Sequence, residues 1–386
     1  MLTKKIIRTS TIPESLYFLL KGQLQFLSKY FEIIGVSSKG KFLDETSNRE
    51  SVKTIGVDMK RGISPLKDLI SLIKLYKVLN KEKPMIVHSI TPKAGLLTML
   101  AGKMAGVPIR MHTFTGLIFP TKTGAMQKLL IKMDQLLCWA ATNIYPEGNG
   151  VKNDLINFNI TSKPLKVLAN GNVNGIDLEF FSKTIISAIQ QNQLKQELGI
   201  EVNDFVFIFV GRLVGDKGIN ELVEAFLMLK SESSKLLLVG PFETELDPLR
   251  EKTLHAIATH KNIISVGFQK DVRPYFAISD CLVFPSYREG FPNVVMQAGA
   301  MELPSIVSDI NGCNEIIIQG ENGLIIPAKN ERAVYEAMYQ LLSDGELYSD
   351  LKKNSRRMIA ERYEQSVVWE ALLAEYQKLL SNCKIS

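Results

Sequence analysis

One short stretch in the second half of the chain has the residue types and spacing to hold an anion beside a sugar. The stretch REGFPNVVMQAG, residues 288–299, places the carboxylate of Glu289 before a Gly-Phe-Pro turn that leads into a helix-forming segment. The first backbone N–H groups of a helix lack partners within the helix, and together with its dipole they can bind phosphate. Glu289 could accept hydrogen bonds from sugar hydroxyls, or it could merely complement the helix dipole.

A second stretch could clamp a diphosphate. In FVFIFVGRLVGDKG, residues 205–218, a hydrophobic strand ends at Val210, and the following turn carries Arg212 and Lys217 before a helix. Arginine offers a planar fork to phosphate oxygens and lysine a point charge. The alternative is that both are surface charges that flank a turn.

A carboxylate pair would suggest glycosidase chemistry, and the sequence argues against it. Gln297 stands eight residues after Glu289, where a second acid would complete the pair. Position 297 lies about one turn inside the expected helix, whereas Glu289 precedes that helix. The two side chains therefore cannot face each other across a glycosidic oxygen, as a glycosidase requires.

The segments that position these residues alternate between short β-branched runs and longer periodic stretches. This alternation predicts βαβ crossovers and parallel sheets that are covered on both faces. The strands expected in the first half are 5–9, 31–37, 52–57, 85–90, 108–114, 142–146 and 164–169, and the pattern restarts after residue 200. The segment 66–80 is predicted to be an amphipathic helix, with one apolar face made of Leu66, Leu69, Ile70, Ile73 and Tyr76.

The predicted fold class is α/β, with two Rossmann-like doubly wound domains. We expect one domain at 1–172, joined by the amphipathic C-terminal helix 364–386, and the other at 173–363. The joint lies in the Gly- and Asn-rich stretch 170–181. Two such domains facing a central cleft would place the carboxyl ends of both sheets around it, where ligands of open α/β sheets bind.

Charge and composition narrow the classes of partner. The 386 residues carry a net charge of +6, but residues 1–174 hold 25 Lys and Arg against 11 Asp and Glu. A basic half suggests an anionic ligand or membrane surface, or else a solvated face of no function. The basic residues are dispersed without interleaved aromatics, which argues against nucleic acid. The longest apolar runs are too short to span a bilayer, and four widely spaced cysteines suit a reducing compartment, so we expect a cytoplasmic protein.

Four motifs in order along the second half resemble the donor-binding half of a retaining GT-B-fold glycosyltransferase of family 4. They are GRLVGDKGINELVEAF, VGF, SYREGFPNVVMQAGAMELPSIVSD and NGCNEIIIQGENGLIIP. The resemblance continues through VHSITPKAG and MHTFTG in the first half, and so covers nearly the whole chain. Within the family, the sequence is most similar to bacterial enzymes that build capsular or O-antigen polysaccharide.

The resemblance implies a role for each matching residue. Arg212 and Lys217 would hold the diphosphate of a UDP-hexose or UDP-N-acetylhexosamine. Glu289 and His112 would be the catalytic residues beside the donor sugar, and Gly116 would face the acceptor. The other implied donor contacts are Gly267, Phe268 and Gln269 at the nucleobase, Gly290, Phe291 and Pro292 beneath the sugar, Asn293 and Val294 at the phosphate, and Gln297 at the ribose.

The implied reaction moves a sugar, with retention, onto a lipid-diphosphate-linked acceptor at the inner face of the cytoplasmic membrane, without a metal or cofactor. Two departures from the family stand out. The loop after the first strand has no glycine before Gly22, where the family has Gly-Gly, and Gln297 replaces a glutamate at a cost of roughly 1 kcal/mol in donor binding. Two alternatives remain: a sugar-nucleotide epimerase of similar architecture, and a catalytically silent sugar-nucleotide-binding partner protein.

Overall fold

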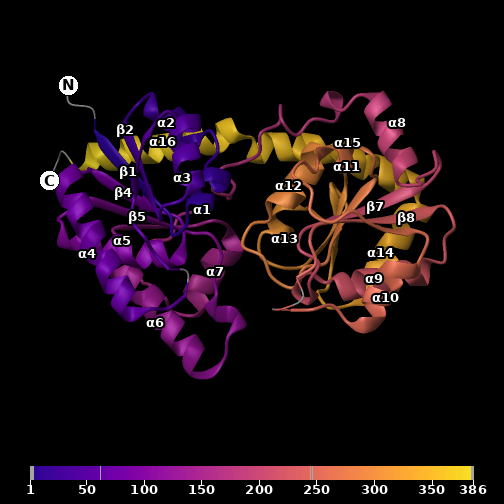
Figure 1. Ribbon diagram of the computed structural model, residues 1–386, viewed down its shortest axis with the longest axis horizontal. Coiled ribbons are helices and arrows are strands. Elements are labelled where there is room, and N and C mark those ends of the chain that lie inside the picture. Colours follow the sequence, from indigo (N-terminus) through magenta and orange to yellow (C-terminus); the bar gives the residue numbers. More distant parts are fainter. Residues whose placement is uncertain (1–3, 61, 244, 246, 384–386) are drawn as a thin grey trace. The chain divides into compact units, whose positions relative to one another are not determined.

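The chain folds into two compact α/β units. The computed structural model describes residues 4–60, 62–243, 245 and 247–383 (Figure 1). One unit comprises residues 1–175 and 365–386, and the other comprises residues 176–364. Each unit contains one six-stranded parallel sheet, so the predicted pair of doubly wound domains is confirmed.

The first sheet has the strand order of a Rossmann fold. Its order is β3-β2-β1-β4-β5-β6, and the direction in which strands are added reverses between β1 and β4. Ligands of such sheets bind outside the carboxyl ends of the strands at this reversal. The strands are β1 (Lys5–Thr9), β2 (Glu32–Ser37), β3 (Lys53–Gly56), β4 (Ile86–Ser89), β5 (Ile109–Phe114) and β6 (Asn143–Pro146).

Helices cover both faces of the first sheet and form two separate cores with it. One face packs against α4 (Pro65–Glu82), α5 (Pro92–Met104), α6 (Gly124–Ala140) and α7 (Asn149–Asn157). The other packs against α1 (Pro13–Leu19), α2 (Gln23–Ser28), α3 (Lys41–Glu50) and the C-terminal α16 (Gln365–Asn382). A short 3₁₀ helix, η1 (Phe119–Thr121), precedes α6. The C-terminal helix therefore belongs to the first unit, as the sequence predicted.

The second sheet repeats the same topology. Its order is β12-β11-β10-β7-β8-β9, with the reversal between β7 and β10. Its strands are β7 (Phe205–Val210), β8 (Ser234–Val239), β9 (Ile263–Ser265), β10 (Cys281–Phe284), β11 (Ser305–Ser308) and β12 (Gly323–Ile326). Its helices are η2 (Lys183–Ile185), α8 (Ala188–Glu197), η3 (Gly215–Lys217), α9 (Ile219–Leu229), α10 (Glu251–Thr259), α11 (Arg273–Ala277), α12 (Asn293–Ala300), α13 (Cys313–Ile316), α14 (Glu331–Ser343) and α15 (Gly345–Tyr363).

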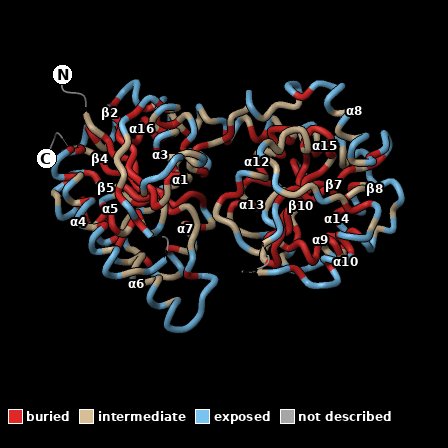
Figure 2. Tube along the Cα trace, viewed as in Figure 1, coloured by how far each residue is buried: buried red, intermediate tan, exposed pale blue. Residues whose placement is uncertain are grey.

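The strands read as continuous apolar runs because both of their faces are covered. In β7, FVFIFV, the four central residues are buried, and every residue of β4 and β10 is buried as well. Figure 2 shows this burial concentrated on the strands of each unit, with exposed residues on the outer faces of the helices. Runs of this kind are typical of parallel sheets in α/β proteins.

Two predictions about the first half are wrong. Residues 164–169 form no strand, and only an isolated bridge joins Ile144 and Leu165. Helix α4 exists, but it packs through Leu75 and Leu79, whereas Leu66, the first residue of the predicted apolar face, is 80% exposed. The next three residues of that face, Leu69, Ile70 and Ile73, are exposed too.

Candidate active site

The two stretches singled out in the second half meet where the second sheet reverses its order. Strands β7 and β10 are neighbours there, so the loops that follow them lie side by side. Lys217, which ends η3 after β7, forms an ion pair with Glu289, which follows β10. The side chains are 18% and 16% exposed, so both charges remain within reach of a ligand. The Ser286 hydroxyl donates to the same carboxylate at 2.8 Å and fixes its orientation.

A glycine allows these two loops to approach so closely. Gly218 has φ +71°, and a Cβ atom at this position would lie 2.1 Å from the carbonyl oxygen of Pro285. Any other residue would push the loops apart or strain the backbone. The backbone N–H of Tyr287 also donates to the carbonyl of Asp216 at 2.8 Å. The positions of the lysine and the glutamate are therefore set by the backbone.

Arg212 occupies a neighbouring position on the same sheet edge. Its guanidinium is 52% exposed and forms an ion pair with Glu243 in the loop after β8. Within the described part of the chain, it makes no hydrogen bond or ion pair with Lys217 or Glu289. The structure thus places both predicted cations at the carboxyl edge of the sheet, but only Lys217 contacts the predicted catalytic carboxylate.

The loop predicted to border a nucleobase lies next to the Arg212 turn. A Cβ atom on Gly240 would lie 1.8 Å from the carbonyl oxygen of Gly211, and the N–H of Gly240 donates to the carbonyl of Gly267 at 2.9 Å. The turns after β7, β8 and β9 therefore pack on one another through backbone. Phe268 is 73% exposed and can offer its ring to a planar ligand, while the Gln269 side chain donates to the Val266 carbonyl at 2.8 Å.

Helix α12 begins at Asn293, directly after the Gly-Phe-Pro turn. Pro292 occupies the N-cap position and makes no side-chain capping hydrogen bond. The turn is held in place from the other side, because a Cβ atom on Gly312 would lie 2.4 Å from the Gly290 carbonyl oxygen. Phe291 is 6% exposed, and its ring packs edge-on against Tyr363. Its side chain is thus a core residue, and only its backbone faces the turn.

Three other residues lie in or near α12. Val294 packs partly buried against the core. Gln297 is half-buried, and its side chain has no hydrogen-bond partner within the described part of the chain. Cys313 lies close by, and burial first, then the charge of Glu289, hold its thiol pKa well above the usual value. A protonated thiol is a poor nucleophile, so Cys313 does not offer one.

In the first unit, His112 is a core residue. It is fully buried on β5 and shares a 2.8 Å hydrogen bond between its Nδ1 and the Ser89 hydroxyl. A Cβ atom on Gly95 of α5 would lie 2.4 Å from the ring, so this helix glycine makes room for the imidazole. Burial lowers the pKa of His112 to about 3, which keeps the ring neutral. Nε2 has no hydrogen-bond partner among the described residues. In this conformation the His112 side chain is enclosed by the core and is not open to a substrate. Its catalytic role stays a prediction.

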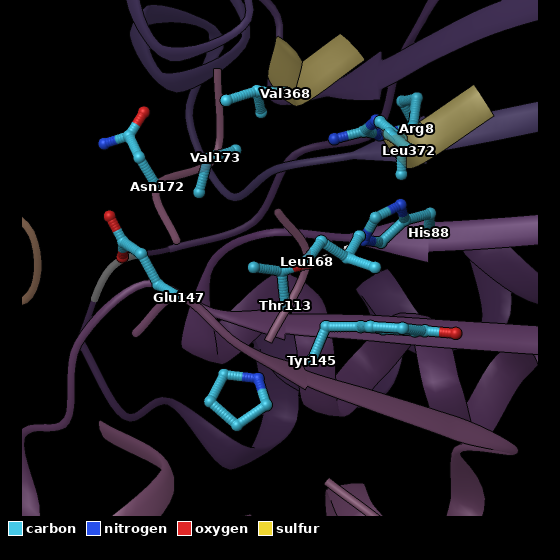
Figure 3. Close-up of a pocket in the computed structure, with 11 residues that line it drawn as sticks. Arg8, His88, Thr113, Tyr145, Glu147, Leu168, Asn172, Val173, Val368 and Leu372 are labelled. Carbon is cyan, nitrogen blue, oxygen red and sulfur yellow. Dashed lines mark hydrogen bonds between the residues drawn. The ribbon is translucent and has the colours of Figure 1, made fainter. Parts of the chain in front are cut away.

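A second buried histidine is fully engaged in the core beneath α16. His88 contacts the Tyr376 hydroxyl through Nδ1 at 2.7 Å and the Thr113 hydroxyl through Nε2 at 2.8 Å. Arg8, also fully buried, donates to Tyr376 at 3.1 Å. These side chains border a cavity of about 20 Å³, which is room for roughly one water molecule (Figure 3). The cluster ties the C-terminal helix to the first sheet and leaves no space for a substrate.

The reversal of the first sheet holds hydroxyl groups that the sequence reasoning did not assign. Thr11 follows β1 and Thr91 follows β4, and their hydroxyls lie 2.8 Å apart. The Thr11 hydroxyl also accepts from the N–H of Ala94 in the first turn of α5, at 3.1 Å. The family that this sequence resembles has glycines in this loop. Here the Thr11 hydroxyl instead bonds to the N-terminus of α5. The sequence does place a threonine two residues after each of the strands that border the reversal.

Gly116, the predicted acceptor-side residue, lies in the loop after β5 with φ +103°, a conformation that favours glycine. None of the described His, Cys, Asp and Glu residues gather in groups of three or more that could hold a metal ion. Across the described residues, every helix is too short or too polar to cross a membrane.

Sequence comparisons agree with this geometry. The pattern of the family described as "Glycosyl transferases group 1" matches residues 190–358, and that of "Glycosyl transferase 4-like" matches residues 12–147. The capsular polysaccharide biosynthesis glycosyltransferase CapM of Staphylococcus aureus is 32% identical over 385 residues, which is 98% of each chain. An Escherichia coli galactosyltransferase, named as acting on α-D-GlcNAc-diphosphoundecaprenol, is 30% identical over 78% of each chain.

Solved structures share the whole fold. A glycosyltransferase from Rickettsia africae superposes with a TM-score of 0.81 and 18% identity, over 99% of this chain and 100% of that one. Anabaena HepE in complex with UDP also gives 0.81, with 16% identity, over 97% and 100%. Two Rossmann-like units of this topology define the GT-B class of glycosyltransferases. Within that class, the chain belongs to the glycosyltransferases whose two halves match the 4-like and the group 1 families.

Proposed function

We propose that this glycosyltransferase moves a sugar from a UDP-sugar onto a sugar carried by a polyprenyl diphosphate, with retention of anomeric configuration, during synthesis of a capsule or O-antigen type of polysaccharide. The expected donor is a UDP-hexose or UDP-N-acetylhexosamine. The observation that carries the proposal is the partly exposed Lys217–Glu289 pair at the reversal of the second sheet. Ligands of open α/β sheets bind at that place.

The chemistry of the pair suits a sugar-diphosphate donor. When the bond between sugar and diphosphate breaks, negative charge develops on the leaving oxygen. Lys217 and Arg212 are cations at the same sheet edge, and the N-terminus of α12 adds the positive end of its helix dipole. In this proposal the ammonium group of Lys217 turns from Glu289 to the phosphate, which frees the carboxylate to accept from sugar hydroxyls. No metal is required for either step.

Retention is proposed to proceed by attack on the same face from which the diphosphate leaves. A double displacement would need a protein nucleophile beneath the sugar. The Cys313 thiol is protonated, and in this proposal the Glu289 carboxylate accepts from the Ser286 hydroxyl and from sugar hydroxyls, so neither group is assigned as that nucleophile. The departing phosphate oxygen is then the base closest to the acceptor hydroxyl, and it can take up the proton that this hydroxyl loses.

The relatives support the polysaccharide setting and the acceptor class. The Staphylococcus aureus relative is named for capsular polysaccharide biosynthesis. The Escherichia coli relative, and a Campylobacter jejuni relative that is 26% identical over 82% of each chain, are both named for diphosphoundecaprenol acceptors. Anabaena HepE binds UDP and UDP-glucose in its crystal structures.

We further propose that the first unit docks on an anionic membrane surface at the cytoplasmic face. The exposed apolar stripe of α4, which begins with Leu66 and Leu69, lies among lysines such as Lys67 and Lys74. Apolar contact and roughly 1 kcal/mol per lysine near anionic lipid would act together. Binding to vesicles should weaken when anionic lipid is removed or salt is raised. Unchanged binding under both conditions would contradict the docking proposal.

A single incubation separates the proposal from its two alternatives. The protein is mixed with labelled UDP-sugars and an undecaprenyl-diphosphate-linked sugar, with and without a chelator. We expect label in the lipid product, an α-linkage from an α-linked donor by NMR, and a rate that the chelator does not change. An epimerised nucleotide without transfer would support the epimerase, and binding of UDP-sugar without any product would support the silent partner.

A further inference from the structure

A second candidate site lies in the first unit, beside the N-terminus of α5. A cavity of about 170 Å³ opens between the N-terminus of α5, helix α6 and the loop after β5. Its lining is mostly aliphatic and aromatic, with Leu96 from α5, Leu117 from the loop, and Leu130 and Met133 from α6. Gly116, the residue predicted to face the acceptor, lies on its wall. The cavity is therefore an apolar compartment that begins at the expected acceptor side of the unit.

The size and lining of the cavity exclude a sugar ring as its occupant. A cavity of roughly 150 Å³ with apolar walls is known to hold a benzene molecule. A hexose has about twice as many heavy atoms as benzene, and most of its hydroxyls would lose their water against aliphatic and aromatic walls. One isoprene unit is slightly smaller than benzene and carries no polar atom. The compartment fits a branched hydrocarbon of that size.

One ionisable side chain faces this compartment without a partner. Asp134 of α6 lines the cavity, and among the described residues it has no side-chain hydrogen bond or ion pair. Burial raises its pKa to about 7, so its carboxyl group holds a proton over much of the range in which most carboxylates are charged. Lys93, the other charged residue of the lining, is held by Asp68 at 2.7 Å. The lining thus holds one carboxyl group that is neutral below about pH 7 and one charge that is paired.

The approach to the cavity is positively charged. Lys93 also donates to the Gly62 carbonyl, which ties the segment before α4 to the cavity wall. Lys60 precedes Gly62 by two residues, and Lys67 lies in the first turn of α4 beside Asp68. The ammonium group of Lys60 holds the pKa of Lys67 below its usual value. Two neighbouring cations next to the segment that Lys93 ties to the cavity wall can together bind a compact anion.

We propose that the cavity holds the isoprene unit next to the diphosphate of the polyprenyl-linked acceptor, while Lys60 and Lys67 engage that diphosphate. The choice of a prenyl diphosphate rests on the acceptor class of the proposed function. The rest of the chain would leave past Ile63 and Ile118, which line the cavity and are 49% and 46% exposed. The site would select lipid diphosphates over free sugar diphosphates and fix how far the acceptor sugar projects.

Direct binding tests this without any sugar transfer. Calorimetry compares inorganic diphosphate with dimethylallyl diphosphate, in saturating UDP so that the nucleotide site is filled. We expect dimethylallyl diphosphate to bind on the order of 100-fold more tightly, because most of its hydrocarbon leaves water. A variant that fills the cavity, Met133→Trp, should lose this advantage. The matched control Leu129→Trp, on the same helix but 45% exposed, should keep it.

Several results would overturn the assignment. Equal affinity for the two diphosphates in the wild type would remove the apolar subsite, and so would an undiminished advantage in Met133→Trp. If that variant fails to fold, Leu117→Trp fills the same cavity from a loop and takes its place. Lys60→Ala with Lys67→Ala should weaken both diphosphates by similar factors, and unchanged affinities would remove the cationic rim.

The same assay separates this inference from the proposed function. Prenyl-dependent binding without transfer to an undecaprenyl-linked sugar would leave the cavity assignment standing and refute the reaction. Transfer that is equally fast with a methyl-capped and a prenyl-capped sugar diphosphate would do the opposite. Both measurements use the full chain, and binding and transfer are read independently. A failure of one therefore cannot be mistaken for a failure of the other.

Discussion

The two sheets share one strand order, but their reversal points hold different chemistry. Between β7 and β10, Lys217 pairs with Glu289, and both side chains stay partly exposed. Between β1 and β4, the hydroxyls of Thr11 and Thr91 bond to each other, and Thr11 also accepts from the N–H of Ala94. The first arrangement holds charges that a ligand can compete for. The second holds neutral groups that already have partners.

The helices at the two reversals differ in the same way. In α5 the N–H of Ala94 in the first turn donates to the Thr11 hydroxyl of a neighbouring loop, whereas the N-cap of α12 is a proline without a side-chain hydrogen bond. Unpaired N–H groups at a helix start attract phosphate, and a hydroxyl that caps them removes part of that attraction. A Rossmann-like topology therefore permits an anion site without building one. The residues after the strands decide which half of the molecule binds the nucleotide.

The largest effect is expected when the positive charge of Lys217 at the second reversal is removed. We expect Lys217→Ala to lower kcat by about 100- to 1,000-fold, because one fixed partner of the leaving diphosphate is lost. Initial rates with a saturating UDP-sugar measure the effect. The control is Lys261→Ala, which breaks an ion pair with Glu232 whose side chains are 72% and 83% exposed. A rate within about threefold of wild type for Lys217→Ala would show that the pair is structural.

The next test asks whether His112 packs or reacts. Gly95→Ala places a Cβ atom 2.4 Å from the imidazole and should cost about 1–3 kcal/mol of unfolding free energy, read from thermal melting. Adding His112→Ala should recover part of that loss by removing the crowded ring. His112→Asn alone should then lower the melting temperature clearly, while kcat stays close to that of the wild type. A large loss of kcat at an unchanged melting temperature would instead establish a catalytic histidine.

A third test concerns the capped helix at the first reversal. Thr11→Val keeps the shape of the side chain but leaves the N–H of Ala94 and the Thr91 hydroxyl short of a partner. We expect a loss of about 2 kcal/mol in denaturant unfolding, with the affinity for UDP unchanged. Thr121→Val is the control, since that exposed hydroxyl bonds only within its own turn. Weaker UDP binding by Thr11→Val would mean that the first reversal also serves the nucleotide.

A fourth test uses pH to probe the first unit. The pKa of Asp134 is about 7 in the folded chain and near 3.8 when unfolded, so the folded state binds the proton more tightly. Stability is then fully present below about pH 3.8 and is lost as pH rises to about 7. Asp134→Asn should raise the unfolding free energy by about 1–2 kcal/mol at pH 8 and leave it unchanged at pH 4.

The control for that test is Asp44→Asn, which alters an exposed carboxylate on α3 of the same unit. Lys93 also lines the cavity, but Asp68 holds it, and the Cys138 thiol one turn along α6 has its pKa raised by burial to about 12. With its pKa at about 12, the Cys138 thiol stays uncharged between pH 4 and 8. An equal gain for Asp134→Asn at both pH values would show that the carboxyl group is not protonated in the fold.

The sequence predicted most strands for one physical reason, whereas only the resemblance to family 4 implied that Lys217 and Glu289 share one donor site. Strands covered on both faces must be apolar throughout, so their ends are easy to locate, and loops after adjacent parallel strands share one edge. Their contact then follows from the order of the strands. The run 164–169 lies beside the edge strand β6, but it makes only one bridge with it, between Ile144 and Leu165, and so it forms no strand.

What the sequence could not predict is which side of an element faces the core. The period of α4 identifies an apolar stripe, but the sheet takes Leu75 and Leu79, so Leu66 stays exposed. The same holds for His112, because its neighbours along β5 cannot show whether its side of the strand lies under α5. Both outcomes depend on the packing of distant segments, which no local pattern contains.

The smallest expected effect concerns the second reversal, where the nucleotide is proposed to bind. Gln297 lies one turn into α12 and makes no side-chain hydrogen bond within the described part of the chain, so a ribose hydroxyl can reach its amide. Gln297→Glu should tighten UDP binding about fivefold, roughly 1 kcal/mol, because a carboxylate accepts from both hydroxyls. The gain should vanish with 2′-deoxy-UDP, and Gln340→Glu on exposed α14 should show none. An equal gain for both nucleotides would place residue 297 away from the ribose.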